Sequence, residues 1–406
     1  MTISTFAKAP VDSNARAYRV ESIDMVRGLV IVIMALDHVR DFVMVAAASD
    51  PMTDPDVSAS LFFTRWITHF CAPVFVCLAG VSAGLMATRK TPRDLGVFLL
   101  TRGLWLIVVE MFVLANIVTF SPFGLEPLGG GTLIVMQVIW AIGASMIVLA
   151  GAQFLGQRTC LALGAAVVLG HNLVDPVWPI TNGPIEPGPP LWVSLHAQMG
   201  YIAGPFYFAF IYPVVAWIGV MLLGFGVAPL WRDAPAVRDR RLLKYGAAAV
   251  VAFLVLRVTG VYGDPNPWQA QSDGLHTLLD FLNVTKYPPS LVFLLMTLGP
   301  AAMLCARADR LPRAMTQPFV TFGKAPFAFY VAHILVIHLL SMALGVAQGF
   351  DARQFVTVFF FYPKGYGVGL PGVYLLWLLV VALLYPFCAW VGTIKQRRRD
   401  WWLSYV

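Results

Sequence analysis

Charged side chains are scarce in this sequence. Only 12% of the 406 residues are Asp, Glu, Lys or Arg, whereas 59% are hydrophobic. So little polar surface could not cover a water-soluble domain of this length. The composition therefore excludes a soluble globular protein and predicts a polytopic membrane protein. The net charge of +7 does not indicate a nucleic-acid partner, because the basic residues fall in short clusters between apolar runs.

Cysteine is also rare. The five cysteines all lie within apolar runs and lack the spacing of a metal site: Cys71, Cys77, Cys160, Cys305 and Cys388. We therefore expect neither a disulfide framework nor a bound metal ion. Buried cysteines of this kind are small apolar packing residues.

No polar stretch is long enough to form a soluble domain, but ten apolar runs are long enough to cross a bilayer as helices. They cover approximately residues 24–46, 60–88, 95–119, 131–152, 159–175, 205–230, 242–262, 287–307, 317–347 and 370–394. The sequence thus predicts an all-α polytopic membrane bundle of about ten transmembrane helices. We expect one membrane domain at 24–394, between an N-terminal tail at 1–23 and a basic C-terminal tail at 395–406.

Lysine and arginine collect in alternate loops. These clusters comprise Arg16 and Arg19, then Arg89, Lys90 and Arg93, then Arg158, residues 232–244, Arg307, Arg310 and Arg313, and residues 395–399. The other loops are mainly acidic, with Lys286, Arg353 and Lys364 as their basic residues. By the positive-inside rule, both termini are predicted to be cytoplasmic. No cleavage site follows the polar first 23 residues, so the first span is expected to be an uncleaved signal anchor.

The first apolar run contains two residues that are costly at membrane depth, Arg27 and His38, with ten residues between them. Eleven positions of α-helix correspond to a rise of roughly 16 Å, so the two side chains lie at different depths. Polar side chains in hydrocarbon turn inward and pair with one another, which predicts one continuous cavity along the bundle. Its cytoplasmic mouth would be basic, through Arg27, Arg102 and Lys324, and would admit an anionic cofactor.

His38 is the best candidate for acid–base chemistry, because a neutral imidazole takes a proton from a hydroxyl or amine near neutral pH. Asp41 lies three residues later on the same helix face and is the expected partner. Asp37 points about 100° away and is a poorer one. The alternative is a purely structural role for His38 as a hydrogen-bonded buried histidine.

Arg65 and His69 lie four residues apart in the second run and share a helix face, and Pro73 follows as a possible kink. One interpretation is that they bind the acceptor or relay protons. In the other, Arg65 extends to the membrane interface and His69 bonds a neighbouring helix.

His333 and His338 lie five residues apart in the ninth run and diverge around the helix, which argues against a metal clamp. We expect helix–helix hydrogen bonds from both, although either could assist catalysis. Glu110, Asn116 and Arg102 are likewise expected to be pairing partners.

Two extracytoplasmic loops, at 176–204 and 263–286, are rich in proline, glycine, asparagine and tryptophan. Prolines and glycines set turns that can hold a rigid lid. The tryptophans either stack on a sugar ring or anchor the loops in the lipid headgroups.

Four segments carry a resemblance to bacterial relatives of the heparan-α-glucosaminide N-acetyltransferase catalytic domain, in the transmembrane acyltransferase superfamily. They are RVESIDMVRGLVIVIMALDHVRDF, TRWITHFCAPVFVCLAGVSAG, NVTKYPPSLVFLLMTLGP and RRRDWWLSYV. The resemblance covers nearly the whole chain, and Arg27 and His38 match the arginine and histidine that members typically carry ten residues apart. Lysosomal members place asparagine at the position of His38 and their active histidine in the following loop. Residues 42–60 contain no histidine, so the pattern of bacterial O-acyltransferases assigns that role to His38.

The resemblance implies transfer of an acyl group, with acetyl as the expected group, from cytosolic acetyl-CoA to a glycan on the opposite face of a bacterial cytoplasmic membrane. In this scheme Arg27, Arg102 and Lys324 bind the coenzyme A phosphates. His38 is the general base, Asp41 orients it, and Arg65 or His69 stabilises the oxyanion. The acceptor, the acyl chain, O- or N-acylation, an acyl-histidine intermediate and the oligomeric state stay open.

Two other classes of function fit the sequence. A proton-coupled secondary transporter or flippase for a glycan precursor or organic anion would use the same polar path, but the paired broken helices of many transporters are not visible. A non-catalytic membrane scaffold explains the charges at membrane depth poorly. Tight coenzyme A binding favours the enzyme, whereas transport that needs no acyl donor favours the transporter.

Overall fold

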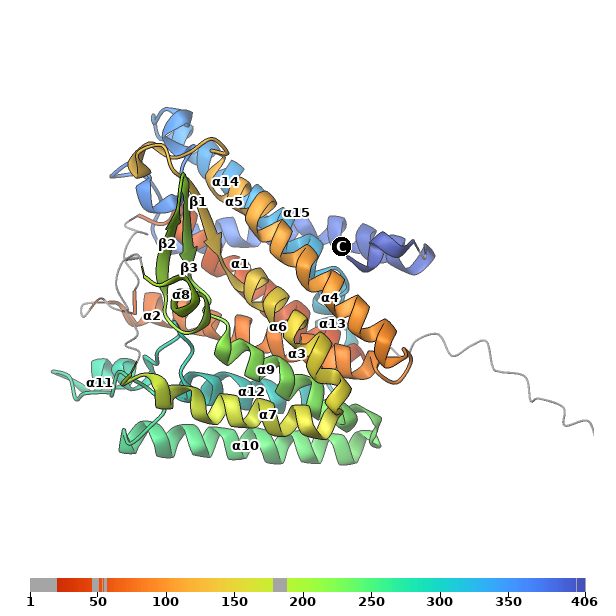
Figure 1. The fold of residues 1–406 in the computed structure, drawn as a ribbon. Helices are drawn as coiled ribbons and strands as arrows, with labels where there is room; N and C mark the ends of the chain where they lie inside the picture. Colours follow the sequence, from red (N-terminus) through yellow and green to blue (C-terminus); the bar gives the residue numbers. More distant parts are fainter. Residues whose placement is uncertain are drawn as a thin grey trace, which may run out of the picture.

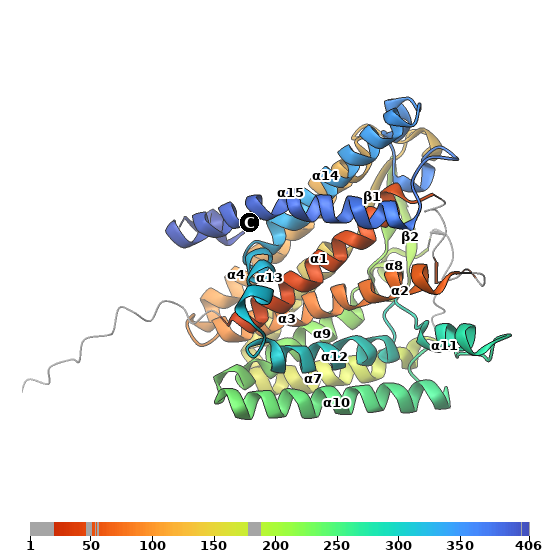
Figure 2. The ribbon, with the colours of Figure 1, turned by 180° about the vertical axis from the view of Figure 1, so that it is seen from behind.

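The structure is a computed structural model that describes residues 20–45, 51–52, 54, 57–177, 188–398 and 400–405. Most of the expected tail at 1–23 therefore lies outside the described residues. In Figures 1 and 2 the helices pack side by side in one bundle with two distinct ends. We call the end at which α1 (Glu21–Val43) begins the basic end, and the end at which it finishes the loop end.

The helices that correspond to the other nine apolar runs are α2 and α3 (Ala59–Ile67, Cys71–Met86), α4 and α5 (Pro92–Val109, Ala115–Thr119), α6 (Val138–Ala152), α7 (Gln157–Gly170), α9 (Val215–Val227), α10 (Pro235–Thr259), α12 (Leu291–Ala308), α14 (Pro326–Ala347) and α15 (Leu370–Arg397). Two further helices, α8 (Pro190–Leu195) and α11 (Gly274–Leu282), lie in the expected loops. A third, α13 (Arg313–Lys324), overlaps the beginning of the run 317–347. Among the described residues, eight helical segments are long and apolar enough to cross a membrane. The mostly helical membrane bundle is thus confirmed with eight candidate spans.

The two expected spans outside these eight are α1 and α7. The first carries several charged residues, and the second has only 14 residues. The expected run 317–347 is also two helices, because Ala325 is not helical (φ −131°, ψ 48°) and separates α13 from α14. The residue before a proline is disfavoured in the α conformation, and Pro326 follows directly.

The all-α expectation was wrong at the loop end. The strands β1 (Thr132–Met136), β2 (Met199–Ala203) and β3 (Phe206–Phe210) form a sheet in the order β1-β3-β2, with β1 parallel and β2 antiparallel to β3. β-Branched and aromatic residues favour strands. Because β1 and β3 are also apolar, they were predicted to be the beginnings of the spans at 131 and 205, whereas β2 lies in the expected loop 176–204. Gly204 (φ 57°) occupies the two-residue turn of the β2–β3 hairpin.

The backbones of α1 and α13 cross in direct contact at the basic end. A Cβ atom at Gly28 would overlap the carbonyl of Phe319, and one at Gly323 would overlap the carbonyl of Asp24. Glycines allow membrane helices to approach this closely. The crossing places the first turns of α1 beside the C-terminal end of α13.

Glu110 is a buried carboxylate in a π-helical turn (Glu110–Leu114) between α4 and α5. Its Oε2 accepts a hydrogen bond of 2.9 Å from the backbone N–H of Trp140, in the first turn of α6. Because α6 starts directly after β1 inside the bundle, its first N–H groups need a buried acceptor. Glu110 supplies that acceptor.

We expect Glu110→Leu to lower the free energy of unfolding by about 2–3 kcal/mol, because it leaves the N-terminus of α6 without its acceptor. Glu110→Gln keeps an acceptor oxygen and should lose less. Thermal unfolding of the detergent-solubilised variants measures both changes. Equal stability of all three proteins would contradict the capping role.

Candidate active site

His38 and His333 meet inside the bundle, one from α1 and the other from α14. Nδ1 of His38 lies 2.6 Å from Nε2 of His333, and the two rings are stacked with their centroids 4.9 Å apart. His333 is fully buried and His38 is half-buried. The His38 side chain therefore faces a neighbouring helix and is tied to it by a hydrogen bond.

The contacts of His333 determine which nitrogen of His38 can accept a proton. Nδ1 of His333 lies 3.1 Å from the carbonyl oxygen of Phe329, which is only an acceptor, so this nitrogen carries the hydrogen. A neutral His333 then has its lone pair on Nε2, and Nδ1 of His38 must donate in the bond between the rings. His38 is left with an unprotonated Nε2, which makes no hydrogen bond to a described residue. This is the tautomer that a general base requires.

Polar side chains lead from the histidine pair to Glu110. The ring of Tyr330 packs 5.4 Å from that of His333, and its hydroxyl donates to Oε1 of Gln137 at 3.5 Å. Gln137 directly precedes α6, whose first turn is capped by Glu110. Tyr330, Gln137 and Glu110 also line one small cavity. The fold thus connects the deepest polar residues of the sequence to His38.

Asp37 joins α1 to α2 next to His38. Its Oδ2 accepts a hydrogen bond of 2.8 Å from Nη1 of Arg65, and its Oδ1 lies 3.1 Å from Nη2 of Arg40. Arg40 also binds the carboxylate of Asp41. The expected pairing of Asp41 with His38 was therefore wrong. The adjacent guanidinium offers Asp41 a charge-assisted bond, while the partner of His38 comes from a distant helix.

A cavity of about 490 Å³ opens at the loop end, and Arg65 and His69 form part of its floor. Arg65 comes from the last turn of α2, and His69 from the 3₁₀ turn Thr68–Phe70 that precedes α3. They are only 5% and 2% exposed. Arg65 does not extend to the interface, and Nδ1 of His69 is buried with no hydrogen-bond partner among the described residues. Both side chains thus line the space that a molecule entering the cavity would occupy.

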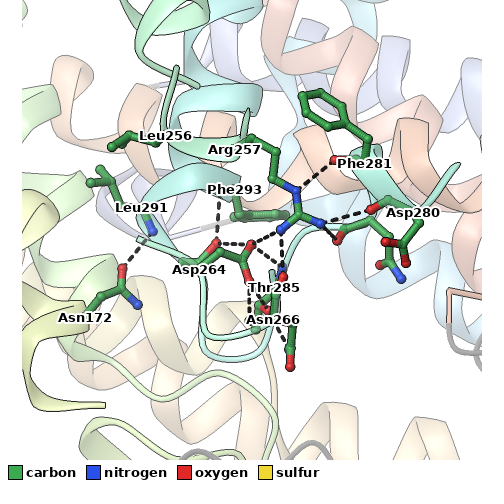
Figure 3. Close-up of polar contacts among 12 residues, drawn as sticks. Asn172, Leu256, Arg257, Asp264, Asn266, Asp280, Phe281, Thr285, Leu291 and Phe293 are labelled. Carbon is green, nitrogen blue, oxygen red and sulfur yellow. Dashed lines mark hydrogen bonds and ion pairs between the residues drawn. The ribbon is translucent and has the colours of Figure 1, made fainter. Parts of the chain in front are cut away.

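One wall of this cavity is the segment 263–290, which is held in place by Arg257 at the end of α10 (Figure 3). The guanidinium donates hydrogen bonds of 2.7–2.9 Å to four backbone carbonyls, those of Asn266, Asp280, Phe281 and Asn283. Asp264 lies 3.6 Å from the guanidinium and accepts bonds from the backbone N–H and the hydroxyl of Thr285. Of the two expected lids, the loop 263–286 is thus part of a wall held by hydrogen bonds, whereas residues 178–187 of the other loop lie outside the described residues. Arg257 was not among the residues predicted from the sequence, although an arginine inside the apolar run 242–262 is a signal for such a role.

His338 and Asn116 have structural roles. The ring nitrogens of His338 lie 2.8 Å from the carbonyl oxygens of Ile117 and Phe355, so this histidine links α14 to α5 and to the turn after α14. Asn116, expected to pair with Glu110, instead donates to Phe112 of its own helical segment.

Three side chains expected to bind phosphate lie at the basic end: Arg27, Arg102 and Lys324. Arg27 donates hydrogen bonds to Asp24 (3.2 Å) and Ser82 (2.7 Å). Arg102 stacks 6.0 Å above the ring of Phe327, three residues beyond Lys324, and lies within electrostatic range of Arg27. Arg27 and Arg102 therefore lie near each other between α1, α4 and α14, and Lys324 is the last residue of α13, with its stem beside Gly392 of α15.

The straight path along α1 from Arg27 to His38 is filled by side chains. Ile31 and Ala35 lie between the two residues on the same helix face and are completely buried. Arg27 lines neither of the two cavities described above. The continuous cavity expected from the sequence is thus interrupted along α1, because apolar side chains pack closely between the polar ends.

Comparison with protein-family models matches residues 19–259 to the family described as heparan-alpha-glucosaminide N-acetyltransferase, catalytic. The match covers more than half of the 406 residues. The chain belongs to this family. Its members are membrane acetyltransferases that use acetyl-CoA as the donor. No curated protein matches the chain.

The part that matches this acetyltransferase family runs from α1 to α10. It therefore contains His38, Arg65 and His69, whereas His333 and Lys286 lie beyond it. The hydrogen bond between His38 and His333 joins the matched part of the chain to the rest. Within this family member, the candidate centre is assembled from both.

Proposed function

We propose that the chain is an integral-membrane acyltransferase that moves an acetyl group from acetyl-CoA at the basic end to a glycan acceptor at the loop end. The observation that carries this proposal is the hydrogen bond between His38 and His333 inside the bundle, from which we infer an unprotonated Nε2 on His38. Family membership supports the reaction class. By the positive-inside rule the basic end and both termini face the cytoplasm, in the inner membrane of a bacterium.

On the acceptor side, Nε2 of His38 takes the proton from the attacking hydroxyl or amine, which bonds to the acetyl carbon as the thioester C–S bond breaks. His38 then passes this proton to the thiolate that leaves. The imidazolium that forms lies next to the carboxylate of Asp37, which balances its charge. Arg65, held by Asp37, and His69 face the cavity and stabilise the oxyanion of the acyl-transfer step. Asp41 acts indirectly, because it binds Arg40, which also lies beside Asp37.

On the donor side, Arg27, Arg102 and Lys324 would hold the phosphates of coenzyme A, because a polyanion needs charge-assisted bonds to leave water. Three cations at the basic end fit that requirement. When bound, acetyl-CoA supplies the acetyl group as an activated thioester. Since Ile31 and Ala35 fill the direct path, the proposal requires a second conformation in which α1 separates from its neighbours.

The test uses radiolabelled acetyl-CoA, purified protein in liposomes and an extract of envelope glycans as acceptor. His38→Gln should lower the rate of label transfer about 10²- to 10⁴-fold, the usual contribution of a general base. Thermal unfolding confirms that the variant is folded. Undiminished label transfer by His38→Gln would reject His38 as the base. Gradient-driven movement of a glycan without an acyl donor would show that the protein is a transporter and not an acyltransferase.

Arg27→Gln tests the donor site separately. We expect it to raise the KM for acetyl-CoA about tenfold with little change in kcat, because it removes one charge-assisted phosphate contact. Arg353→Gln, an exposed arginine in the turn after α14, is the matched control. An unchanged KM in Arg27→Gln would reject the phosphate role.

A further inference from the structure

The floor of the 490 Å³ cavity contains a buried cation, Lys286, that forms no ion pair with a carboxylate in the part of the chain that the structure describes. Lys286 is 7% exposed, lines the cavity, and makes neither a hydrogen bond nor an ion pair with a described residue. Its ammonium lies 5.0 Å above the ring of Tyr287. A buried charge without a partner is costly, so a functional ligand is its natural explanation.

The neighbouring charges do not cancel that of Lys286. Arg65 and Arg40 are matched by Asp37 and Asp41, so the group carries three cations and two carboxylates when the histidines are neutral. Tyr287 lies in the electrostatic potential of this group. Burial raises the pKa of its hydroxyl, but the charges of Lys286 and Arg65, together with a hydrogen bond to Tyr212, lower it on balance.

The rest of the cavity suits a polyhydroxylated molecule. Amide and hydroxyl side chains that can bond sugar hydroxyls line it, namely Gln198, Asn266, Gln271, Asn283 and Thr285. The carboxylates of Asp54 and Asp280 are also part of the lining. Asp54 is exposed, and Asp280 accepts a bond of 2.6 Å from the backbone of Gln269. The cavity therefore has a cationic floor below a polar, partly acidic mouth.

The position of Lys286 is set before any ligand arrives. The preceding residue, Thr285, is bonded to Asp264 through both its backbone N–H and its hydroxyl. Arg257 donates a hydrogen bond to the carbonyl of Asn283, three residues before Lys286. Such preorganisation lowers the entropic cost of binding.

We propose that this cavity selects an acceptor with an anionic group, a carboxylate or a phosphate, on a sugar or polyol, and that Lys286 binds this group. The inference rests on the proposed function only in calling the ligand an acceptor. The anionic group is held at the buried floor, and the remaining hydroxyls face the amide side chains.

Binding is measured by calorimetry on the protein in nanodiscs of phosphatidylcholine, without acetyl-CoA. The probes are glucuronate, its neutral analogue glucuronamide, glucose 6-phosphate and inorganic phosphate. We expect at least one anionic sugar to bind tenfold or more tightly than glucuronamide, with an affinity that falls as salt rises. The preferred sugar shows whether Lys286 binds a carboxylate or a phosphate.

Lys286→Met should abolish the preference for the anionic sugar, Lys286→Arg should retain most of it, and the control Arg353→Met should leave it unchanged. Equal binding of glucuronate, glucose 6-phosphate and glucuronamide would overturn the inference, as would a preference that survives in Lys286→Met. If inorganic phosphate binds as tightly as either anionic sugar, the claim that the cavity selects a sugar or polyol is overturned. A charge preference without acetyl transfer rejects the proposed reaction alone, and transfer to neutral acceptors without a preference rejects this inference alone.

Discussion

Replacing His333 by leucine is expected to lower kcat for acetyl transfer about 100-fold or more, even though His38 remains in place. The substitution removes the acceptor for Nδ1–H of His38, so nothing holds the ring in the tautomer with a free Nε2. Catalytic histidines depend strongly on the group that orients them. The KM for acetyl-CoA should change little, because the donor-binding cations lie at the other end of α1.

His333→Gln is the conservative variant, since its amide oxygen can accept the bond from His38. We expect it to recover part of the activity that leucine loses. His338→Leu is the control, because His338 bonds only backbone carbonyls and its loss should lower stability without lowering kcat of the folded fraction. A positioning role would be rejected if leucine and glutamine were equally impaired, or if His333→Leu had normal kcat.

The helical framework could be predicted from the sequence because long apolar runs have few alternatives in a membrane. The rise per residue of an α-helix was enough to predict that Arg27 and His38 lie at different depths in the membrane. The strand TLIVM was missed because its apolar side chains satisfy a hydropathy search as well as a helix does. Its hydrogen-bonding partner lies more than 70 residues away in β3, beyond the reach of local patterns.

The partner of His38 could not be predicted for a similar reason. Helix periodicity identifies neighbours on one helix, and it pointed to Asp41. The fold brings His333 to that position from 295 residues away, while Arg40 binds Asp41. Arg65 and His69, by contrast, were predicted to share a face and do line one cavity. Local geometry thus predicts which residues share a face, and tertiary packing decides what that face contacts.

Arg257→Leu is expected to lower the free energy of unfolding by about 3–5 kcal/mol, the cost of removing one member of a buried ion pair. Arg257 is 2% exposed, and its loss leaves four backbone carbonyls without their donor and the buried carboxylate of Asp264 without its cation. Thermal unfolding measures the loss. Hydrogen exchange should rise in residues 263–290 before the rest of the chain, since this wall loses its anchor.

Two variants determine whether the lost stability comes from the contacts that hold the segment 263–290. Arg241→Leu is the matched control on the same helix, because its ion pair with Asp233 is 2.6 Å long but half-exposed and should contribute less than about 1 kcal/mol. In the double variant with Asp264→Leu, the two losses should be clearly less than additive, since each single change leaves the other charge buried and unpaired. The anionic-sugar preference assigned to Lys286 should also weaken in Arg257→Leu, because the guanidinium holds the chain on which Lys286 lies. Strict additivity together with an unchanged preference would show that the wall is held by other contacts.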